Sequence, residues 1–198
     1  MSLLIKICGL SDLHSIDAAV AAGADAVGFV FAESVRQVTP QRALEISKGV
    51  PSTVKRVAVM LHPDNEAWLR VLDVFAPDVL QTDAADYDEL DVPYSVERWP
   101  VFREGVSSPG KDATTYVFEG ARSGAGETVN WSQAARIAKL GSMILAGGLG
   151  PDNVAEAITT VRPGGDDVSS GVETAPGKKD TPLITEFIVA ARAVEKHL

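Results

Sequence analysis

The chain has 198 residues, which is enough for one domain, spanning residues 1–198, with a substantial buried core. Its contents of 45% hydrophobic and 23% charged residues are ordinary for a soluble globular protein. A formal net charge of −9 disfavours nucleic acid and anionic membrane surfaces as partners, so an anionic ligand would need backbone N–H groups, helix N-termini or a few placed cations. No apolar run is long enough to cross a membrane, no signal-peptide pattern opens the sequence and a single cysteine cannot form an internal disulfide, so we expect a cytoplasmic protein.

The first half of the chain alternates between strand-like and helix-like segments. Apolar, β-rich runs predict strands over residues 3–8, 26–31, 54–61 and 79–81. Helices are expected to begin at Ser11, Thr39 and Asp64, because Ser, Thr and Asp are favoured N-cap residues. Gly23 is expected to close the first helix, and residues 86–90 leave room for only a short helical turn.

The second half continues the alternation less regularly. Strands are predicted over residues 95–103, where Pro100 weakens the pattern, and over residues 115–119, 143–146 and 166–170. A glycine-rich loop over residues 120–126 precedes a helix capped by Asn130. Two further helices are expected to begin near residues 151–153 and at Thr181.

The order of these segments indicates the fold class. Near-continuous apolar strands separated by helices are typical of a parallel sheet buried on both faces, either doubly wound or closed into a barrel. Eight strands in sequence favour an α/β fold of the (βα)8 TIM-barrel type, close to the lower size limit of that fold. Functional residues of such barrels lie at the C-terminal ends of the strands, so these ends supply the candidate site.

Cys8, the only cysteine of the chain, follows the first strand. A free cysteine is usually a small buried hydrophobic residue, but at this end of a barrel strand it is also a candidate general base. Side chains alternate along a strand, so Lys6 should point to the same side, and its ammonium would lower the pKa of the thiol toward neutrality. Lys6 could equally pair with a carboxylate such as Asp167.

Glycine and serine motifs follow the seventh and eighth strands, where barrel enzymes often bind phosphate. Glycine lets a phosphate approach the backbone, and successive N–H groups then bind it. Either motif alone could be an ordinary turn, but their presence in both units favours a phosphate site. The predicted phosphate-binding residues are Gly147, Gly148, Ser169, Ser170 and Gly171.

Side chains at other strand ends complete the candidate site. Glu119 ends the sixth strand, across the barrel from Cys8, so the two groups could act on one small substrate as acid and base. Asp83, after the fourth strand, is the rival acid, and both it and Gln81 are candidate substrate contacts. Arg36 is the obvious cation in the loop after the second strand, although it could also be an ordinary surface arginine.

The histidines give no sign of a metal centre. His14, His62 and His197 do not have the spacing of metal ligands. The sequence also lacks a Walker loop and a Gly-x-Gly-x-x-Gly fingerprint. We therefore expect neither a metal nor a cofactor.

Several segments together resemble one family. They are Lys6-Ile7-Cys8-Gly9-Leu10, residues 23–31 (GADAVGFVF), residues 145–154 (LAGGLGPDNV), residues 167–173 (DVSSGVE) and residues 176–180 (PGKKD). These motifs are similar to those of the phosphoribosylanthranilate isomerases of tryptophan biosynthesis. The similarity is specific at both ends of the chain and loose between about residues 81 and 131.

The resemblance implies a (βα)8 barrel that catalyses an Amadori rearrangement without a cofactor. The substrate would be N-(5′-phosphoribosyl)anthranilate and the product 1-(2-carboxyphenylamino)-1-deoxyribulose 5-phosphate. Cys8 matches the base that takes the C2′ proton, and Arg36 matches the contact to the anthranilate. The family acid is usually an aspartate, where this chain has Glu119, and the family histidine after the fourth strand is replaced by Asp83.

Two other functions remain open from the sequence. One is a related aminoaldose isomerase of the histidine-pathway type, which usually employs two aspartates and a longer barrel that binds two phosphates. The other is a barrel that binds a phosphosugar without catalysis. In each case the partner is a phosphorylated small molecule, and we expect a monomer, with a homodimer as the alternative.

Overall fold

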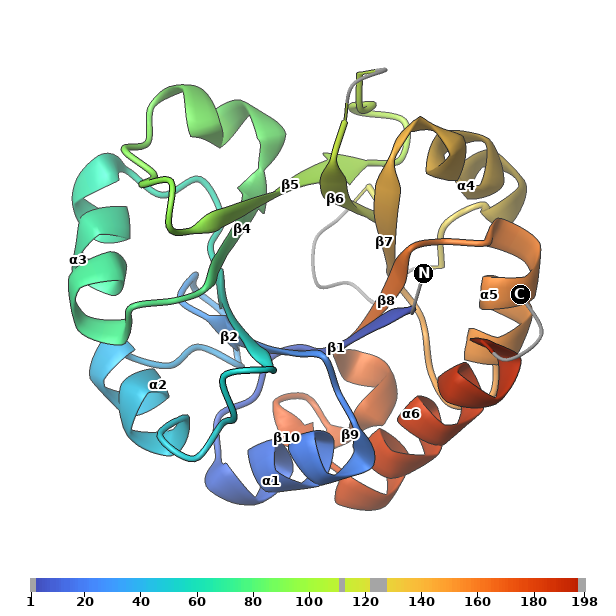
Figure 1. The fold of residues 1–198 in the computed structure, drawn as a ribbon, viewed down its shortest axis with the longest axis horizontal. Helices are drawn as coiled ribbons and strands as arrows, with labels where there is room; N and C mark the ends of the chain where they lie inside the picture. Colours follow the sequence, from blue (N-terminus) through green and yellow to red (C-terminus); the bar gives the residue numbers. More distant parts are fainter. Residues whose placement is uncertain (1–2, 111–112, 122–127, 196–198) are drawn as a thin grey trace.

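The computed structural model describes residues 3–110, 113–121 and 128–195. Eight parallel strands close into a barrel in the order of the chain, which confirms the predicted (βα)8 class. Figure 1 shows the ring of strands with helices around its outside. The strands are β1 (Leu4–Ile7), β2 (Ala26–Val30), β3 (Lys55–Val59), β4 (Val79–Asp83), β5 (Glu97–Arg103), β6 (Thr115–Glu119), β7 (Ser142–Ala146) and β8 (Gly165–Val168).

The helices follow the strands in sequence. They are α1 (Leu13–Ala22), α2 (Pro40–Ile46), α3 (Asn65–Phe75), α4 (Trp131–Ile137), α5 (Val154–Val161) and α6 (Thr181–Glu195). Shorter 3-10 turns are η1 (Ala84–Asp88), η2 (Ala138–Leu140) and η3 (Ser170–Val172). Thr39, Asp64 and Asn130 each accept a hydrogen bond at a helix start, as the sequence predicts, and Gly23 closes α1 in the left-handed conformation.

Two hydrophobic cores hold the barrel together. The larger one lies between the strands and the helices and includes Ile5, Phe29, Tyr116 and Phe187. The smaller one fills the inside of the barrel and includes Val57, Val79, Trp99, Val117 and Ile144. Side chains alternate between these cores along each strand, because successive residues of a strand point to opposite faces.

The inward-facing positions change from apolar to polar toward the C-terminal ends of the strands. On β1, Leu4 is followed by Lys6, and on β4, Val79 is followed by Gln81. Register then brings charged residues side by side: Lys6 is the partner of Asp167 between β1 and β8, and Arg103 is the partner of Glu119 between β5 and β6. The barrel therefore has an apolar floor and a charged mouth.

Several local predictions were wrong. Asp12, not Ser11, caps α1, because the Asp12 carboxylate reaches the backbone N–H of Ser15 at 2.9 Å. The eighth strand ends at Val168 and not at Ser170, since the chain turns into η3 there. Among the described residues no helix connects β5 to β6.

A two-stranded hairpin after β8 was also not anticipated. It consists of β9 (Glu173–Ala175) and β10 (Lys178–Lys179), with Gly177 in the left-handed conformation at its turn. Figure 1 shows it beside the start of α6, near α1. The predicted loop over residues 120–126 lies mostly outside the described residues, and so does His197.

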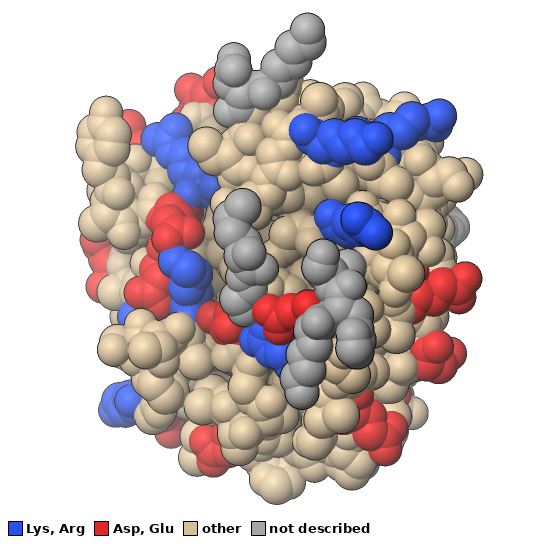
Figure 2. Space-filling view, turned by 45° about the vertical axis from the view of Figure 1, so that its right-hand side comes forward, with Lys and Arg blue, Asp and Glu red and all other residues tan. Residues whose placement is uncertain are grey.

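The outer surface carries charges of both signs. On the face shown in Figure 2, acidic and basic side chains both occur, and most of the visible surface carries neither. Within the described ranges, no helix has both the length and the apolar character needed to cross a membrane.

Candidate active site

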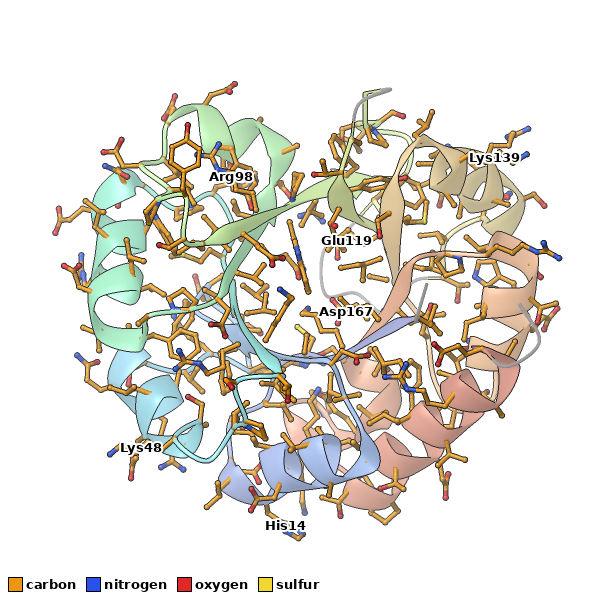
Figure 3. The ribbon with its side chains drawn as sticks, in the orientation of Figure 1. His14, Lys48, Arg98, Glu119, Lys139 and Asp167 are labelled. Atoms are coloured by element: carbon orange, nitrogen blue, oxygen red, sulfur yellow. The ribbon has the colours of Figure 1, made fainter. Side chains whose placement is uncertain are left out.

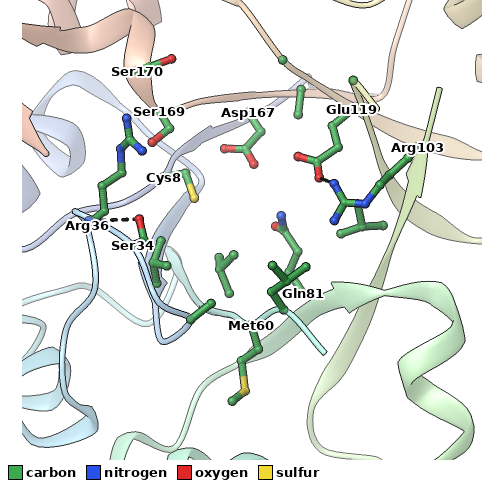
Figure 4. A pocket seen from close by; sticks show the side chains of 18 of the residues that line it. Cys8, Ser34, Arg36, Met60, Gln81, Arg103, Glu119, Asp167, Ser169 and Ser170 are labelled. Carbon is green, nitrogen blue, oxygen red and sulfur yellow. Dashed lines mark hydrogen bonds and ion pairs between the residues drawn. The ribbon is translucent and has the colours of Figure 1, made fainter. Parts of the chain in front are cut away.

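A pocket opens at the C-terminal ends of the strands, where the sequence predicted the site. Figure 4 shows its wall from close by. Most of the predicted site residues line it: Cys8, Arg36, Gln81, Glu119, Gly147, Gly148, Ser169 and Ser170. Asp83 and Gly171 are not part of its wall. In Figure 3, Glu119 and Asp167 lie within the ring of strands, whereas His14, Lys48 and Lys139 lie at the outside.

Cys8 is held at the exit of β1 by its backbone. Its N–H donates to the carbonyl of Val168 at 2.8 Å, and Gly9 then turns the chain in the left-handed region at φ +72°. The cysteine residue is only 7% exposed. Gly28 on β2 leaves room for it, since a Cβ at Gly28 would lie 2.9 Å from the Cys8 sulfur and 3.0 Å from Cε of Lys6.

Lys6 lies beside Cys8 inside the barrel and is fully buried. Its ammonium donates to Oδ2 of Asp167 at 2.5 Å. Burial alone would lower the pKa of Lys6, but Asp167 and Cys8 raise it, so the side chain stays charged. The pairing of Lys6 with Asp167, which the sequence left open as an alternative, is therefore present.

The predicted neutral pKa of Cys8 was wrong. Burial raises the pKa of the thiol above its ordinary value, and the Asp167 carboxylate raises it further. The neighbouring Lys6 and the more distant Lys179 lower it without reversing the shift. The lysine effect was anticipated from the sequence, but the cost of burying a thiolate was not.

Glu119 and Asp83 share one cation. Arg103, at the end of β5, pairs with Oε1 of Glu119 through Nη1 and donates to Oδ1 of Asp83 at 2.6 Å through Nη2. Figure 4 shows the Glu119–Arg103 contact at one side of the pocket. Asp83 also lies 3.4 Å from Nε2 of the more exposed His62. Of the two rival acids, only Glu119 lines the pocket.

Arg36 is not an ordinary surface arginine. Its Nε and Nη2 donate to the two carboxylate oxygens of Glu173 at 2.7 and 2.8 Å, and its side chain is only 13% exposed. These hydrogen bonds raise the pKa of Arg36, which is always charged. Lys179 donates to the same carboxylate at 2.7 Å, so Glu173 bridges two cations.

The loops after β7 and β8 approach each other closely. Gly147 and Gly148 have φ of +97° and +63°, in the region that favours glycine. Asn153 fixes their loop, since it donates to the carbonyl of Gly148 at 2.8 Å and accepts from the N–H of Gly150 at 2.9 Å. A Cβ at Gly171 would lie 1.9 Å from the carbonyl oxygen of Leu149. Gly171 thus permits the approach of the two loops, and it is not part of the pocket wall.

Two buried oxygens in the pocket lack a partner among the described residues. They are Oε1 of Gln81 and Oδ1 of Asp167, both of which belong to side chains of the pocket wall. Buried polar atoms of a folded protein normally form hydrogen bonds. Acceptors without partners at this position suit the hydroxyl or amine groups of a polar ligand.

The described residues contain no group of three or more His, Cys, Asp or Glu side chains that could hold a metal ion. The pocket instead combines a thiol, two paired carboxylates and glycine-rich loops. Such a set can move protons and bind a phosphorylated molecule.

A family model described as N-(5'phosphoribosyl)anthranilate (PRA) isomerase matches residues 5–190. The chain belongs to this isomerase family. The N-(5'-phosphoribosyl)anthranilate isomerase of Oceanobacillus iheyensis is 36% identical over 196 residues, covering 94% of this chain and 95% of the relative. The family expected from the motifs is therefore confirmed, and with it the class of enzyme, an isomerase.

Solved structures agree with this family assignment. The crystal structure of TrpF from Jonesia denitrificans matches with a TM-score of 0.81 and 36% identity, over 98% of both chains. A phosphoribosyl anthranilate isomerase in complex with reduced 1-(o-carboxyphenylamino)-1-deoxyribulose 5-phosphate matches with a TM-score of 0.78 and 31% identity, over 96% of this chain and 99% of that chain.

The sequence indicated no site role for several charged residues that line the pocket of this isomerase-family member or contact its wall. Arg103 could have been found, because it ends β5 just as Glu119 ends β6. Asp167 was considered only as a partner of Lys6, yet it also lines the pocket. Glu173 and Lys179 lie in two of the family motifs, but no role was assigned to them from the sequence, since they reach the site through the hairpin that was not anticipated.

Proposed function

We propose that this protein isomerises N-(5′-phosphoribosyl)anthranilate to 1-(2-carboxyphenylamino)-1-deoxyribulose 5-phosphate in tryptophan biosynthesis, with Cys8 as general base and Glu119 as general acid. The observation that carries the assignment of roles is that both groups line one pocket, together with glycine and serine residues of the loops after β7 and β8. Membership of the isomerase family supports the reaction and a phosphorylated small molecule as substrate.

Glu119 starts the reaction in this proposal. Its proton passes to the furanose ring oxygen, the C1′–O bond breaks, and the anthranilate nitrogen is left as a protonated imine. Glu119 must carry a proton to act as the donor, and the neighbouring Arg103 cation opposes protonation of a carboxylate. Arg103 already donates to Asp83 as well, so it keeps an anionic partner when Glu119 is protonated.

Cys8 completes the reaction as a thiolate. It takes the proton from C2′, and the electrons of that bond neutralise the imine and give an enolamine. The enolamine then loses its hydroxyl proton and gains one at C1′ to become the ketone. Lys6 stabilises the thiolate, but burial keeps the pKa of Cys8 above its ordinary value. Because the base must be ionised, we expect the rate to increase with pH on the acidic side of the pH–rate profile.

The remaining pocket residues bind the substrate in this proposal. Gly147, Gly148, Ser169 and Ser170 bind the phosphate, with Gly171 shaping their loop. Arg36 and Gln81 contact the rest of the molecule. Asp83 acts through Arg103 and not by direct contact, which revises its predicted role as a substrate ligand, because it is not part of the pocket wall.

Loss of phosphoribosylanthranilate fluorescence tests the assignment. The wild-type protein, Cys8→Ser, Glu119→Gln and Asp83→Asn are compared at saturating substrate. A positioned acid or base contributes about 10²–10⁴ in rate, so Cys8→Ser and Glu119→Gln should each lower kcat at least tenfold. Asp83→Asn should have a smaller effect.

Three results would contradict the proposal. If neither Cys8→Ser nor Glu119→Gln slows turnover tenfold, the assigned roles are wrong. A larger loss for Asp83→Asn than for Glu119→Gln would make Asp83 the acid. No turnover by the wild-type protein would favour a barrel that binds a phosphosugar without catalysis. The expected monomer stays a prediction, which sedimentation of the purified protein can check.

A further inference from the structure

The hairpin β9–β10 carries two buried charged residues to which the proposed proton transfers assign no role. The Glu173 side chain is 4% exposed, and the Lys179 side chain is fully buried. Burying charges is costly unless they are paired and hydrogen-bonded. A buried charge cluster at the rim of the pocket therefore suggests a function beyond folding.

Glu173 controls the orientation of Arg36. A guanidinium group offers two edges to a carboxylate, one formed by Nε and Nη2 and the other by Nη1 and Nη2. Glu173 occupies the first edge with hydrogen bonds of 2.7 and 2.8 Å. No hydrogen bond to Nη1 of Arg36 occurs among the described residues, so the second edge remains available to another carboxylate.

The aliphatic part of Arg36 is confined as well. A Cβ at Gly9 would lie 2.6 Å from Cδ of Arg36 and 3.0 Å from the hydroxyl of Ser169. Figure 4 shows the guanidinium close to Ser169, on the side of the pocket formed by the loop after β8. The Arg36 side chain therefore has little space to adopt another orientation.

Lys179 connects the same carboxylate to the phosphate loop. Its ammonium donates to Glu173 at 2.7 Å, to the carbonyl of Ser169 at 2.8 Å and to the Ser169 hydroxyl at 3.2 Å. The N–H of Gly177 in the hairpin turn also donates to Glu173, at 3.2 Å. Burial opposes ionisation, but the hydrogen bonds from Arg36 and Lys179 lower the pKa of Glu173 to about 2.

We propose that Glu173 is a positioning residue that orients Arg36 so that its second edge receives the aromatic carboxylate of the substrate. The inference rests on the proposed function, which supplies a substrate with that carboxylate. Arg36 and Lys179 together carry one more charge than Glu173 neutralises, so the cluster still attracts an anion. Glu173 thus fixes the direction of Arg36 without cancelling the charge of the cluster.

Binding of two stable product analogues tests this role by calorimetry. The first is reduced 1-(o-carboxyphenylamino)-1-deoxyribulose 5-phosphate, and the second is the same compound without the carboxyl group. Glu173→Gln should lower the affinity for the first about tenfold, the order expected when a charge-assisted hydrogen bond loses its geometry. The affinity for the second should change less than about twofold, because only the carboxylate needs the second edge of Arg36.

Turnover gives a second readout. Loss of binding that is equal in ground state and transition state raises KM and leaves kcat unchanged. Glu173→Gln should therefore raise KM for phosphoribosylanthranilate about tenfold with little change in kcat. A matched control is Glu45→Gln, which removes an exposed carboxylate paired with Arg42 on α2 and should change neither constant.

Two further variants keep the test decisive if Glu173→Gln folds poorly. Arg36→Lys retains the charge but not the planar fork, so it should show the same selective loss for the analogue with the carboxyl group. Lys179→Met removes the contacts to both Ser169 and Glu173, so it should weaken the binding of both analogues, since both contain the phosphate.

The outcomes separate the inference from the proposed function. Equal loss of affinity for both analogues in Glu173→Gln and in Arg36→Lys would overturn the positioning role. Wild-type protein that neither binds the first analogue nor isomerises phosphoribosylanthranilate would overturn the proposed function, and the inference with it. Selective loss for the first analogue supports both.

Discussion

Lys6 and Asp167 are register partners on β1 and β8, and their side chains form a buried ion pair with an N–O distance of 2.5 Å. The pair lies inside the barrel next to the Cys8 thiol. A lysine with no access to water is costly to bury unless it is paired. The position of this pair beside Cys8 gives it a direct influence on the proposed base.

Replacing Lys6 with methionine should weaken both the fold and the reactivity of Cys8. Asp167 would keep a buried charge without its cation, at a cost of about 3 kcal/mol in the free energy of unfolding. The pKa of Cys8 should rise further, because Lys6 is the main group that lowers it. Urea unfolding at pH 7 and the rate of iodoacetamide alkylation against pH measure the two effects.

The double variant Lys6→Met/Asp167→Asn separates these effects. It should recover much of the lost stability, since no charge is left unpaired. Alkylation should stay slow, because the ammonium is still missing. Lys48→Met on the outer surface is the matched control and should match the wild type. Unchanged alkylation in Lys6→Met would show that Lys6 does not support the thiolate.

Gly28 gives a steric test of the same site. A Cβ at Gly28 would lie 2.9 Å from the Cys8 sulfur and 3.0 Å from Cε of Lys6, closer than such atoms normally approach. Gly28→Ala should therefore displace both side chains and lower kcat, by about a hundredfold for a shift of 1 Å. Gly49→Ala has nothing within 4 Å of its new Cβ and should leave kcat unchanged. Full activity in Gly28→Ala would mean that the position of Cys8 is not critical.

The sequence was sufficient to predict the barrel and eight residues of the pocket wall. Strand ends can be recognised locally, so Cys8, Gln81 and Glu119 could be found one strand at a time, and eight strands imply a closed ring. Contacts across strands also depend on the register between neighbouring strands, which the pattern within one strand does not determine. The contact of Arg103 with both Asp83 and Glu119 could therefore not be derived from the residues alone.

The hairpin β9–β10 shows a second limit of sequence reasoning. Its strands have three and two residues, too short for an alternation pattern to be visible. Their function comes from side-chain contacts with the loop after β2, more than 130 residues earlier in the chain. The raised pKa of Cys8 was missed for a related reason, since it depends on burial, which only the assembled barrel determines.

Arg103 should be important for stability because its guanidinium forms ion pairs with two carboxylates. It is 11% exposed and pairs with both Asp83 and Glu119. Arg103→Met would leave these acidic groups without their shared cation and should lower the free energy of unfolding by about 2 kcal/mol at pH 7. Adding Asp83→Asn should restore part of this loss. Equal midpoints in urea for Arg103→Met and the wild type would show that the two ion pairs contribute nothing.

Asp166 makes the stability of the fold depend on pH. It points away from the barrel interior next to Ile5 and Leu145, is fully buried, and neither carboxylate oxygen has a partner among the described residues. Burial, with a smaller effect of the adjacent Asp167, raises the pKa of Asp166 to about 8. The folded protein should therefore keep this carboxyl group protonated at neutral pH.

The direction of the pH effect follows from linkage. Below pH 4 both the folded and the unfolded chain hold the proton on Asp166, and between pH 4 and about 8 only the folded chain does. The unfolded state therefore binds fewer protons, and the contribution of Asp166 to the free energy of unfolding decreases as the pH rises through this range. Asp166→Asn cannot ionise and should remove this decrease, which for a pKa difference of about four units amounts to about 5 kcal/mol between pH 4 and pH 8. Asp166→Val also removes the unpartnered polar group and should be more stable at both pH 4 and pH 8. Urea unfolding at the two pH values measures the difference between wild type and variant, so that other titrating groups cancel. If the wild type and Asp166→Asn lose the same stability between pH 4 and pH 8, Asp166 is not protonated in the folded protein.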